Sequence, residues 1–284
     1  MIASYTYGKN LWEVLLISYI KNLIFIFVKQ SNYITSKPMG SKKEYLNLHE
    51  ECKKDLYPDI TKIETELGYS IDTEYYENLA LHTQICIKRS KLNYQHGRLL
   101  YSYLCKFLDE QHKKEKKDIV NIFETGTARG FSSICMSKAL IDSQVVGNIV
   151  TCDLIPHNHL MYWNCIDDMD GKKTREQLLE KWSKELEFII FLNGKTKKTI
   201  SKIGKSRIHF AFLDAQHKYV DVMSEYNFVS KRQKKGDYII FDDVTKKLFP
   251  GVFKAVKAID TKNEYSIKYI FPSDERGYAI AVKN

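Results

Sequence analysis

The chain of 284 residues contains 44% hydrophobic and 28% charged residues, with only 5 prolines and 13 glycines, which excludes disordered, collagen-like and low-complexity architectures. The formal net charge is +9, but the basic residues form short clusters interrupted by acids, as on ordinary solvated surfaces. Six cysteines show no C-x-x-C pair and no zinc-type spacing. We interpret them as free thiols in a reducing cytosol and expect a cytoplasmic protein.

Residues 11–28 form an apolar segment that Glu13, Lys21 and Asn22 interrupt. A bilayer-spanning helix needs about 20 apolar residues, and a lysine in its middle is costly. No small-residue cleavage site follows, which disfavours a signal peptide. Three interpretations stay open: a helix packed on the domain or on a second copy of the chain, a helix at a membrane surface, and a membrane anchor. Peripheral membrane association and a homo-oligomer both depend on this segment.

The next segments predict a helical region without a recognisable motif. Residues 31–60 are polar and contain proline and glycine, which predicts a linker followed by a short helix. Apolar residues at helical spacing then predict two helices around a turn near Gly97, followed by a charged run. We therefore divide the chain into a helical N-terminal region, 1–117, and a second domain, 118–284. The N-terminal region is expected to serve substrate recognition, as a lid, or in assembly.

Beyond residue 118, short apolar runs typical of strands alternate with helical stretches. The predicted strand–helix pairs are 119–124 with 131–141, 148–153 with 174–186, 188–192 with 196–203, 207–214 with 219–231, and 237–242 with 252–260. Five βα units in a row imply a parallel sheet with helices on both faces. Two closing strands, 265–271 and 277–282, predict an antiparallel hairpin at the sheet edge. The predicted fold class is α/β, a Rossmann-like doubly wound sheet of about seven strands with its ligand beyond the carboxyl ends of the strands.

The turn after the first strand has the pattern E-x-G-x-x-x-G, from Glu124 through Gly126 to Gly130. The glycines let the backbone turn sharply and approach a ligand, and the following helix presents free N–H groups. The spacing is neither that of a dinucleotide fingerprint nor that of a P-loop. An acid at the end of the strand favours a ligand with a positive charge or an amino group. Such turns also occur for purely structural reasons, so the pattern alone does not identify the ligand.

Polar residues end the next two strands as well. Asp153 ends the second strand, where a carboxylate can accept hydrogen bonds from both hydroxyls of a ribose, although an aspartate there can also cap a turn. Its position favours the ribose. Asn193 follows the third strand, where the base of a nucleoside ligand would lie. His157 and His159 lie in a long segment, 154–171, that would overhang this ligand, as substrate contacts or as plain loop residues.

Three aspartates and a histidine follow strands four and five: Asp214, His217, Asp242 and Asp243. Three carboxylates do not lie close together without a cation or shared protons. A hard divalent ion is the economical partner. His217, three residues after Asp214, can exchange a proton near neutral pH, whereas the structural alternative is a cap for the helix that starts near residue 219.

Together these motifs resemble the class I S-adenosylmethionine-dependent methyltransferases over roughly residues 118–284. The pattern D-x-x-H-x-Y that begins at Asp214, with the double acid Asp242-Asp243, is most similar to the macrocin- and mycinamicin-type sugar O-methyltransferases and the cephalosporin hydroxylase-like proteins. The family often has glycine or serine where this chain has Ala215 and Gln216.

The resemblance implies a role for each motif residue. The implied cofactor is S-adenosylmethionine (SAM), and the implied contacts are Glu124, Gly126, Thr127 and Gly130 at its methionine end, Asp153 at the ribose, Asn193 at the adenine, and Asp214 beside it. The implied ligands of Mg²⁺ or Mn²⁺ are Asp214, Asp242 and Asp243. The implied catalytic residues are His217, as general base, and Asp214.

The chemistry agrees with these roles. A sulfonium methyl group needs an in-line nucleophile, and a hydroxyl becomes one when a metal ion lowers its pKa and His217 takes its proton. The sequence lacks the N/D-P-P-Y/F loop of base N-methyltransferases and the Pro-Cys pair of cytosine C5-methylases. We therefore predict a metal-assisted O-methyltransferase with a small-molecule or glycan acceptor, a hydroxyl of a sugar or glycosylated metabolite, and no nucleic-acid partner. Two alternatives remain: an RNA-associated binding protein on the same fold, motivated by the basic charge, and a Rossmann oxidoreductase or hydroxylase, for which the glycine spacing is wrong.

Overall fold

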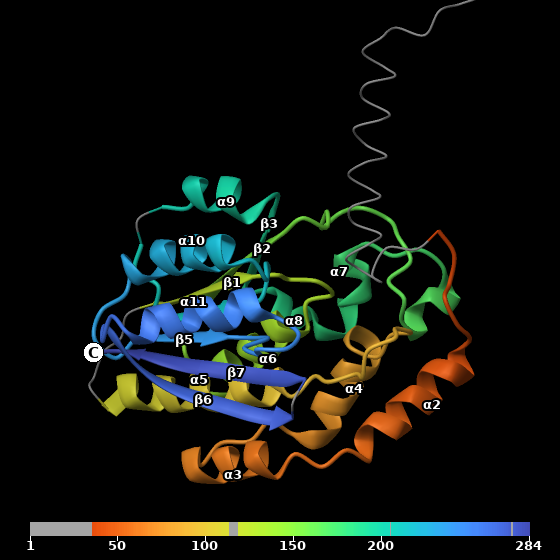
Figure 1. Ribbon diagram of the computed structural model, residues 1–284. Coiled ribbons are helices and arrows are strands. Elements are labelled where there is room, and N and C mark those ends of the chain that lie inside the picture. The colour runs from red at the N-terminus through yellow and green to blue at the C-terminus, as the bar shows by residue number, and fades with distance from the viewer. Residues whose placement is uncertain (1–35, 114–118, 205, 274) are drawn as a thin grey trace, which may run out of the picture.

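The computed structural model describes residues 36–113, 119–204, 206–273 and 275–284 (Figure 1). These residues form a seven-stranded sheet with the order β3-β2-β1-β4-β5-β7-β6. Its strands are β1 (Val120–Thr125), β2 (Gly147–Asp153), β3 (Ile189–Asn193), β4 (Phe210–Leu213), β5 (Tyr238–Phe241), β6 (Tyr265–Ser273) and β7 (Arg276–Lys283). Strands β1 to β5 run parallel, and β7 pairs antiparallel with both β5 and β6. The predicted α/β fold with a C-terminal antiparallel hairpin is confirmed.

Helices cover both faces of this sheet and also form the N-terminal region (Figure 1). They are α2 (Lys42–Lys53), α3 (Pro58–Leu67), α4 (Thr73–Thr83), α5 (His96–Lys113), α6 (Phe131–Asp142), α7 (Arg175–Leu178), α8 (Ser183–Leu186), α9 (Thr196–Thr199), α10 (Tyr219–Ser230) and α11 (Pro250–Asp260). The predicted helix 174–186 is broken, because a 3₁₀ turn separates α7 from α8.

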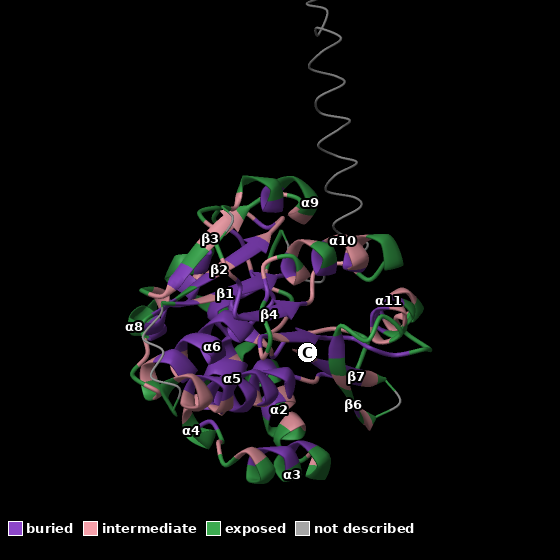
Figure 2. Cartoon of the chain, turned by 90° about the vertical axis from the view of Figure 1, so that its left-hand side faces the viewer, coloured by how far each residue is buried: buried purple, intermediate pink, exposed green. Residues whose placement is uncertain are grey.

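Successive residues along the strands face two different apolar cores. Phe210 and Phe212 of β4 belong to the core with α5 and α6, whereas Ala211 and Leu213 belong to the core with α10 and α11. Because both faces are covered, the strands are nearly continuous apolar runs, which explains why they could be recognised in the sequence. Figure 2 shows this burial in the central strands and α6, with exposed residues gathered on outer helices such as α3 and α9.

The N-terminal helices share one core with the sheet. Tyr45 of α2, Leu79 of α4 and Leu104 of α5 are fully buried in the same apolar cluster as Ile134 of α6 and Ile149 of β2. The helical region therefore packs through α5 against α6 and one face of the sheet, and it supplies one wall of the site described below.

The short helix predicted within residues 31–60 is α2, which begins at Lys42. Ser41 and Glu44 form a capping box at the start of α2, in which the Glu44 carboxylate accepts a hydrogen bond of 2.7 Å from the Ser41 N–H. The helix buries only Tyr45 and His49, so its mostly polar sequence has no clear apolar stripe.

The predicted turn near Gly97 is wrong. Gly97 lies inside α5, and the break between α4 and α5 falls at residues 84–95. Glycine is needed here for close packing, because a Cβ atom would lie 2.6 Å from the ring of Phe131. The glycine therefore marks a helix–helix contact and not a change of chain direction.

Within the described ranges, no helix is long and apolar enough to cross a membrane. The segment 11–28 lies outside the described residues, so membrane association and a homo-oligomer through this segment stay predictions.

Candidate active site

Close backbone contacts shape the glycine-rich turn between β1 and α6. Gly126 has φ of +89°, and a Cβ atom on it would lie 2.2 Å from the carbonyl oxygen of Asp214. Gly130, the N-cap of α6, has φ of +93° and faces Leu179, whose Cδ1 would lie 2.6 Å from an added Cβ. The two glycines are therefore required by the backbone, and Gly126 brings the turn against the end of β4.

The Glu124 carboxylate points into the protein. Its two oxygens accept hydrogen bonds from the hydroxyls of Ser132 and Ser133 in the first turn of α6. The residue is fully buried, and this burial raises the pKa of its carboxyl above the usual range. Glu124 holds the start of α6 in place, and its contact with a cofactor stays a prediction. Thr127 is likewise buried, with its hydroxyl 2.5 Å from that of Thr151.

Asp153 lies at the carboxyl end of β2 and connects three segments. Its carboxylate accepts hydrogen bonds from the backbone N–H of Ala128, at 2.5 Å, and of Ile155, at 2.7 Å, and lies 3.7 Å from the guanidinium of Arg175. Burial raises the pKa of the Asp153 carboxyl, although Arg175 and the backbone donors oppose this effect. The carboxylate is thus held beside the glycine-rich turn, where the prediction places the ribose.

Asn193 is exposed at the end of β3, and its side-chain amide donates a hydrogen bond of 3.1 Å to the carbonyl oxygen of Leu154. The imidazole of His157 stacks on Phe191 of β3, with ring centroids 4.2 Å apart. His159 is exposed. Of the two histidines that the sequence left open, the structure brings only His157 against the ends of β2 and β3.

Two fully buried arginines tie the segment 154–174 to the glycine-rich turn. Arg129, from the turn itself, donates a hydrogen bond of 2.6 Å to the carbonyl oxygen of Trp163. Arg175, at the start of α7, donates one of 2.9 Å back to the carbonyl oxygen of Ala128. This segment is therefore fastened to the glycine-rich turn, and its position over a bound ligand stays a prediction.

The ends of β4 and β5 bring together a cluster of two aspartates and a histidine. The ligand-type atoms of Asp214, His217 and Asp243 all lie within 4.8 Å of one another, and His217 Nε2 is 3.1 Å from an oxygen of Asp243. Asp242 is not a member of this group: its carboxylate accepts a hydrogen bond from the Asp243 N–H at 2.7 Å and lies 4.0 Å from His96 Nδ1. Of the predicted ligands, Asp214 and Asp243 thus lie together with His217, whereas a ligand role for Asp242 stays a prediction.

The backbone explains this arrangement. Asp243 has φ of +56°, a left-handed conformation that is rare outside glycine and turns the chain after β5. Adjacent side chains on either side of such a turn diverge. Asp242 therefore points toward α5, and Asp243 points toward His217.

The negative charge at this cluster exceeds the positive charge of Arg276, the arginine that contacts it. The guanidinium of Arg276, the first residue of β7, is 2.6 Å from the second oxygen of Asp243. Burial, with the charges of Asp242 and Asp243, raises the pKa of the Asp214 carboxyl well above its usual range. The same two effects, burial and Asp243, raise the pKa of Asp242 to about 7. At neutral pH the site thus favours either protons or an added cation.

These donors fit a divalent metal ion. Carboxylate oxygens suit Mg²⁺ and Mn²⁺, and an imidazole nitrogen is also a common metal ligand. The carboxylates of Asp214, Asp243 and the neighbouring Asp242, against the guanidinium of Arg276, leave two uncompensated negative charges when all the acids are ionised, which matches the charge of a divalent cation. The residues present are therefore compatible with the ion that the resemblance implies.

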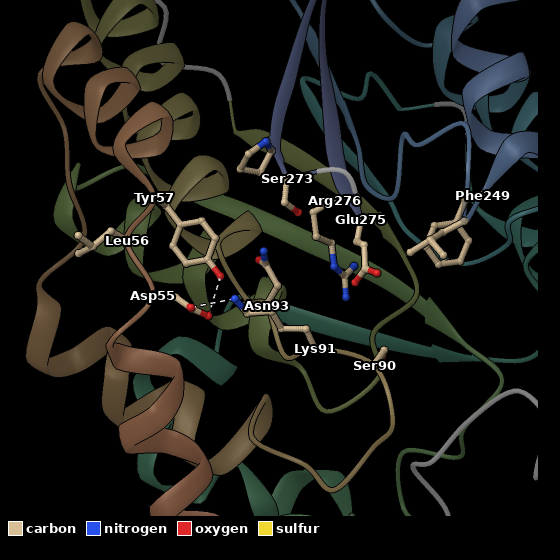
Figure 3. A pocket seen from close by; sticks show the side chains of 12 residues that line it. Asp55, Leu56, Tyr57, Ser90, Lys91, Asn93, Phe249, Ser273, Glu275 and Arg276 are labelled. Atoms are coloured by element: carbon tan, nitrogen blue, oxygen red, sulfur yellow. Dashed lines mark hydrogen bonds and ion pairs between the residues drawn. The ribbon is translucent and has the colours of Figure 1, made fainter.

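A cavity of about 190 Å³ opens beside the cluster (Figure 3). One wall comes from the N-terminal region, where the carboxylate of Asp55 lies 2.8 Å from Lys91 Nζ and 3.5 Å from the hydroxyl of Tyr57. The opposite side includes Arg276 and Phe249, whose ring centroid is 4.3 Å from that of His217. The cavity therefore borders the cluster through two of its lining residues, Arg276, which contacts Asp243, and Phe249, which packs on His217.

Sequence reasoning missed several of these residues. Arg276 follows two acids in what looks like an ordinary charged hairpin turn, and nothing in the local sequence connects it with Asp243. His96 stacks on Phe212 with ring planes 9° apart, but in the sequence it looks like an unremarkable helix start. Both residues reach the site through long-range packing, and no local pattern reports such packing.

The sheet order, the edge hairpin and the glycine-rich turn define a Rossmann-like α/β fold. Within this fold, residues 123–244 match the family model described as a methyltransferase domain. The matched residues contain the glycine-rich turn and the acidic cluster. No protein of the curated set matches the chain at a significant level.

Solved structures share this fold at low sequence identity. The O-methyltransferase TomG from Streptomyces achromogenes, in complex with SAM, is 15% identical, with a TM-score of 0.52 over 76% of this chain and 92% of that chain. An O-methyltransferase from Bacillus cereus, in complex with SAH, is also 15% identical, with a TM-score of 0.50 over 78% of this chain and 91% of that chain. At this identity the likeness concerns the fold.

Proposed function

We propose that this protein is a SAM-dependent O-methyltransferase that acts on a hydroxyl of a sugar, glycan or glycosylated metabolite. The observation that carries the proposal is the position of Asp214. Its backbone contacts Gly126 in the glycine-rich turn, and its carboxylate belongs to the cluster with His217 and Asp243 beside the cavity. A methyl donor held by the turn and an acceptor held in the cavity would therefore meet at this residue, as group transfer requires.

The proposed cofactor site follows the carboxyl ends of β1, β2 and β3. The turn at Gly126 to Gly130 leads into the N-terminus of α6, Asp153 provides the ribose acceptor, and Asn193 lies where the adenine is expected. The two similar O-methyltransferases were solved with SAM and SAH, which supports the same ligand here.

The cavity suits a neutral acceptor with several hydroxyl groups. Its charged residues are mostly paired: Asp55 with Lys91, and Arg276 with Asp243. Tyr57 and Phe249 offer aromatic surface on opposite sides, which can pack on the apolar face of a sugar ring. A volume of about 190 Å³ is small for a ligand site and fits a single ring. These features support the macrocin-type sugar resemblance and the role of the N-terminal region in acceptor recognition.

In the proposed reaction the acceptor oxygen attacks the methyl carbon of SAM, the carbon–sulfur bond breaks, and its electron pair stays on sulfur. The acceptor proton goes to His217. Because His217 Nε2 lies 3.1 Å from Asp243, that nitrogen is suited to carry a hydrogen and leave Nδ1 as the proton acceptor. Asp214 and Asp243 would hold Mg²⁺ or Mn²⁺, which lowers the pKa of a bound hydroxyl. The Asp242 carboxylate supports Asp243 by accepting a hydrogen bond from the Asp243 backbone N–H.

The test combines cofactor binding with methyl transfer. Titration calorimetry should show that the protein binds SAH, and that Asp153→Asn, which keeps the shape of the side chain but removes its charge, weakens this binding at least about tenfold. Transfer of labelled methyl from SAM is then measured with monosaccharide glycosides, catechols and RNA as acceptors. Transfer to the glycosides supports the proposal. Methylation of RNA, or RNA binding without any methyl transfer, would favour the RNA-associated alternative. Absence of SAH binding would refute methyl transfer to either a sugar or RNA.

A further inference from the structure

Arg276 lies at the boundary between the acidic cluster and the acceptor cavity. Its guanidinium contacts Asp243 at 2.6 Å, its side chain is 21% exposed, and it lines the cavity. The hairpin backbone holds it there, because the Val244 N–H donates a hydrogen bond of 2.8 Å to the carbonyl oxygen of Gly277. A Cβ on Gly277 would lie 2.3 Å from the Val244 carbonyl oxygen, so the start of β7 is packed tightly against the segment after β5.

The contact uses the same carboxylate that a metal ion would need. Asp243 has one oxygen on Arg276 and the other 3.1 Å from His217. Among the ion pairs of the described residues, Arg276 is the lysine or arginine that contacts this cluster. An arginine side chain stays charged at any ordinary pH and is weakly hydrated, so it is well suited to a permanent buried ion pair.

We propose that Arg276 is a resident counter-ion that competes with the divalent cation for Asp243 and so keeps the affinity of the site for that ion low. The proposal rests on the ion site of the proposed function. A cation that binds between Asp214 and Asp243 is repelled by the nearby guanidinium and must share a carboxylate with it. The hairpin, which contributes no ligand itself, would thus set how strongly the ligands after β4 and β5 hold an ion.

The experiment measures Mn²⁺ binding by electron paramagnetic resonance and calorimetry, without any acceptor. Arg276→Gln removes the competing charge and should tighten Mn²⁺ binding by roughly tenfold or more. Lys91→Gln is the matched control: it removes the same charge from the same cavity, but its partner is Asp55, and it should change the affinity by less than about threefold. Adding Asp243→Asn to Arg276→Gln should abolish the gain.

Two further measurements keep the result decisive. Arg276→Lys, which retains a charge but grips a carboxylate less firmly, should give a smaller gain and serves if Arg276→Gln does not fold. SAH titration of each sample tests the methyltransferase proposal separately, because the cofactor turn does not contain Arg276. Unchanged or weaker Mn²⁺ binding in both Arg276 variants, an equal gain in Lys91→Gln, or a gain that survives Asp243→Asn would each overturn the proposal.

Discussion

Replacing Glu225 by glutamine tests whether a carboxyl buried beside the core of α10 and α11 is neutral in the folded protein. Glu225 lies on α10, is 4% exposed, and accepts a hydrogen bond of 2.9 Å from the hydroxyl of Thr125 at the end of β1. Burial, with a small contribution from Asp221, raises the pKa of the Glu225 carboxyl from 4.5 to about 8, although the bond from Thr125 opposes the shift. Glutamine keeps the shape and the oxygen that accepts this bond, but it cannot ionise.

The sign follows from proton linkage. Because the pKa is higher in the folded state, the fold keeps a proton that the unfolded chain releases above pH 4.5, so stability is fully present below that pH and falls as the pH rises toward 8. A shift of 3.5 pKa units corresponds to about 5 kcal/mol. The free energy of unfolding of Glu225→Gln should therefore gain on the wild type by about 1.4 kcal/mol per pH unit across this window.

Urea unfolding followed by tryptophan fluorescence, at several pH values between about 5 and 8, measures this difference. Glu187→Gln, at an exposed position, is the control and should keep a constant offset from the wild type. If the difference between Glu225→Gln and the wild type stays constant with pH, Glu225 is already ionised in the fold, and the assignment of a neutral buried carboxyl is wrong.

Three further predictions concern the site. Gly126→Ala should lower the free energy of unfolding by about 1–3 kcal/mol in urea unfolding, because its φ is +89° and its Cβ would lie 2.2 Å from the Asp214 carbonyl oxygen; a neutral effect would show that this turn is not rigid. Arg129→Met should lower the free energy of unfolding by about 3 kcal/mol, because the Trp163 carbonyl group loses its charged donor. The same change should make residues 154–174 more sensitive to proteolysis, and unchanged protection from the protease would contradict the proposed anchoring. His217→Ala should lower kcat by about 10²–10⁴ with unchanged SAH affinity and little loss of stability, because the side chain is 44% exposed; near-full kcat with a lowered Tm would make the histidine structural.

The fold could be predicted from the sequence because its strands are covered on both faces. Apolar runs such as Tyr238–Phe241 stand out against polar turns, and the rule that parallel strands place their ligands at the carboxyl ends directed attention to Asp153, Asp214 and Asp243. The bounds of helix α2 could not be set in this way, since only Tyr45 and His49 of its twelve residues are buried. Local patterns therefore reported the central sheet better than the helices on its periphery.

The directions of the side chains within the site could not be predicted from the sequence. The sequence places Asp242 and Asp243 side by side, and only the positive φ of Asp243 separates their side chains. A non-glycine residue in this conformation leaves no signature in composition or periodicity. Arg276 depends on the pairing of β7 with β5, a contact between segments far apart in the chain. Residue types at strand ends can thus be predicted, whereas the direction in which each side chain points requires the folded backbone.

The fastening of residues 154–174 by Arg129 and Arg175 limits how this protein can be rebuilt by loop exchange. One arginine reaches into the segment from the glycine-rich turn, and the other reaches back to the turn from the end of the segment. A graft of residues 154–175 alone would replace Arg175, which donates to the Ala128 carbonyl group, and would alter the backbone around the Trp163 carbonyl group that accepts from the buried Arg129. The glycine-rich turn and this segment therefore have to be exchanged together. A chimera is expected to fold only when residues 126–130 and 154–175 come from the same parent protein.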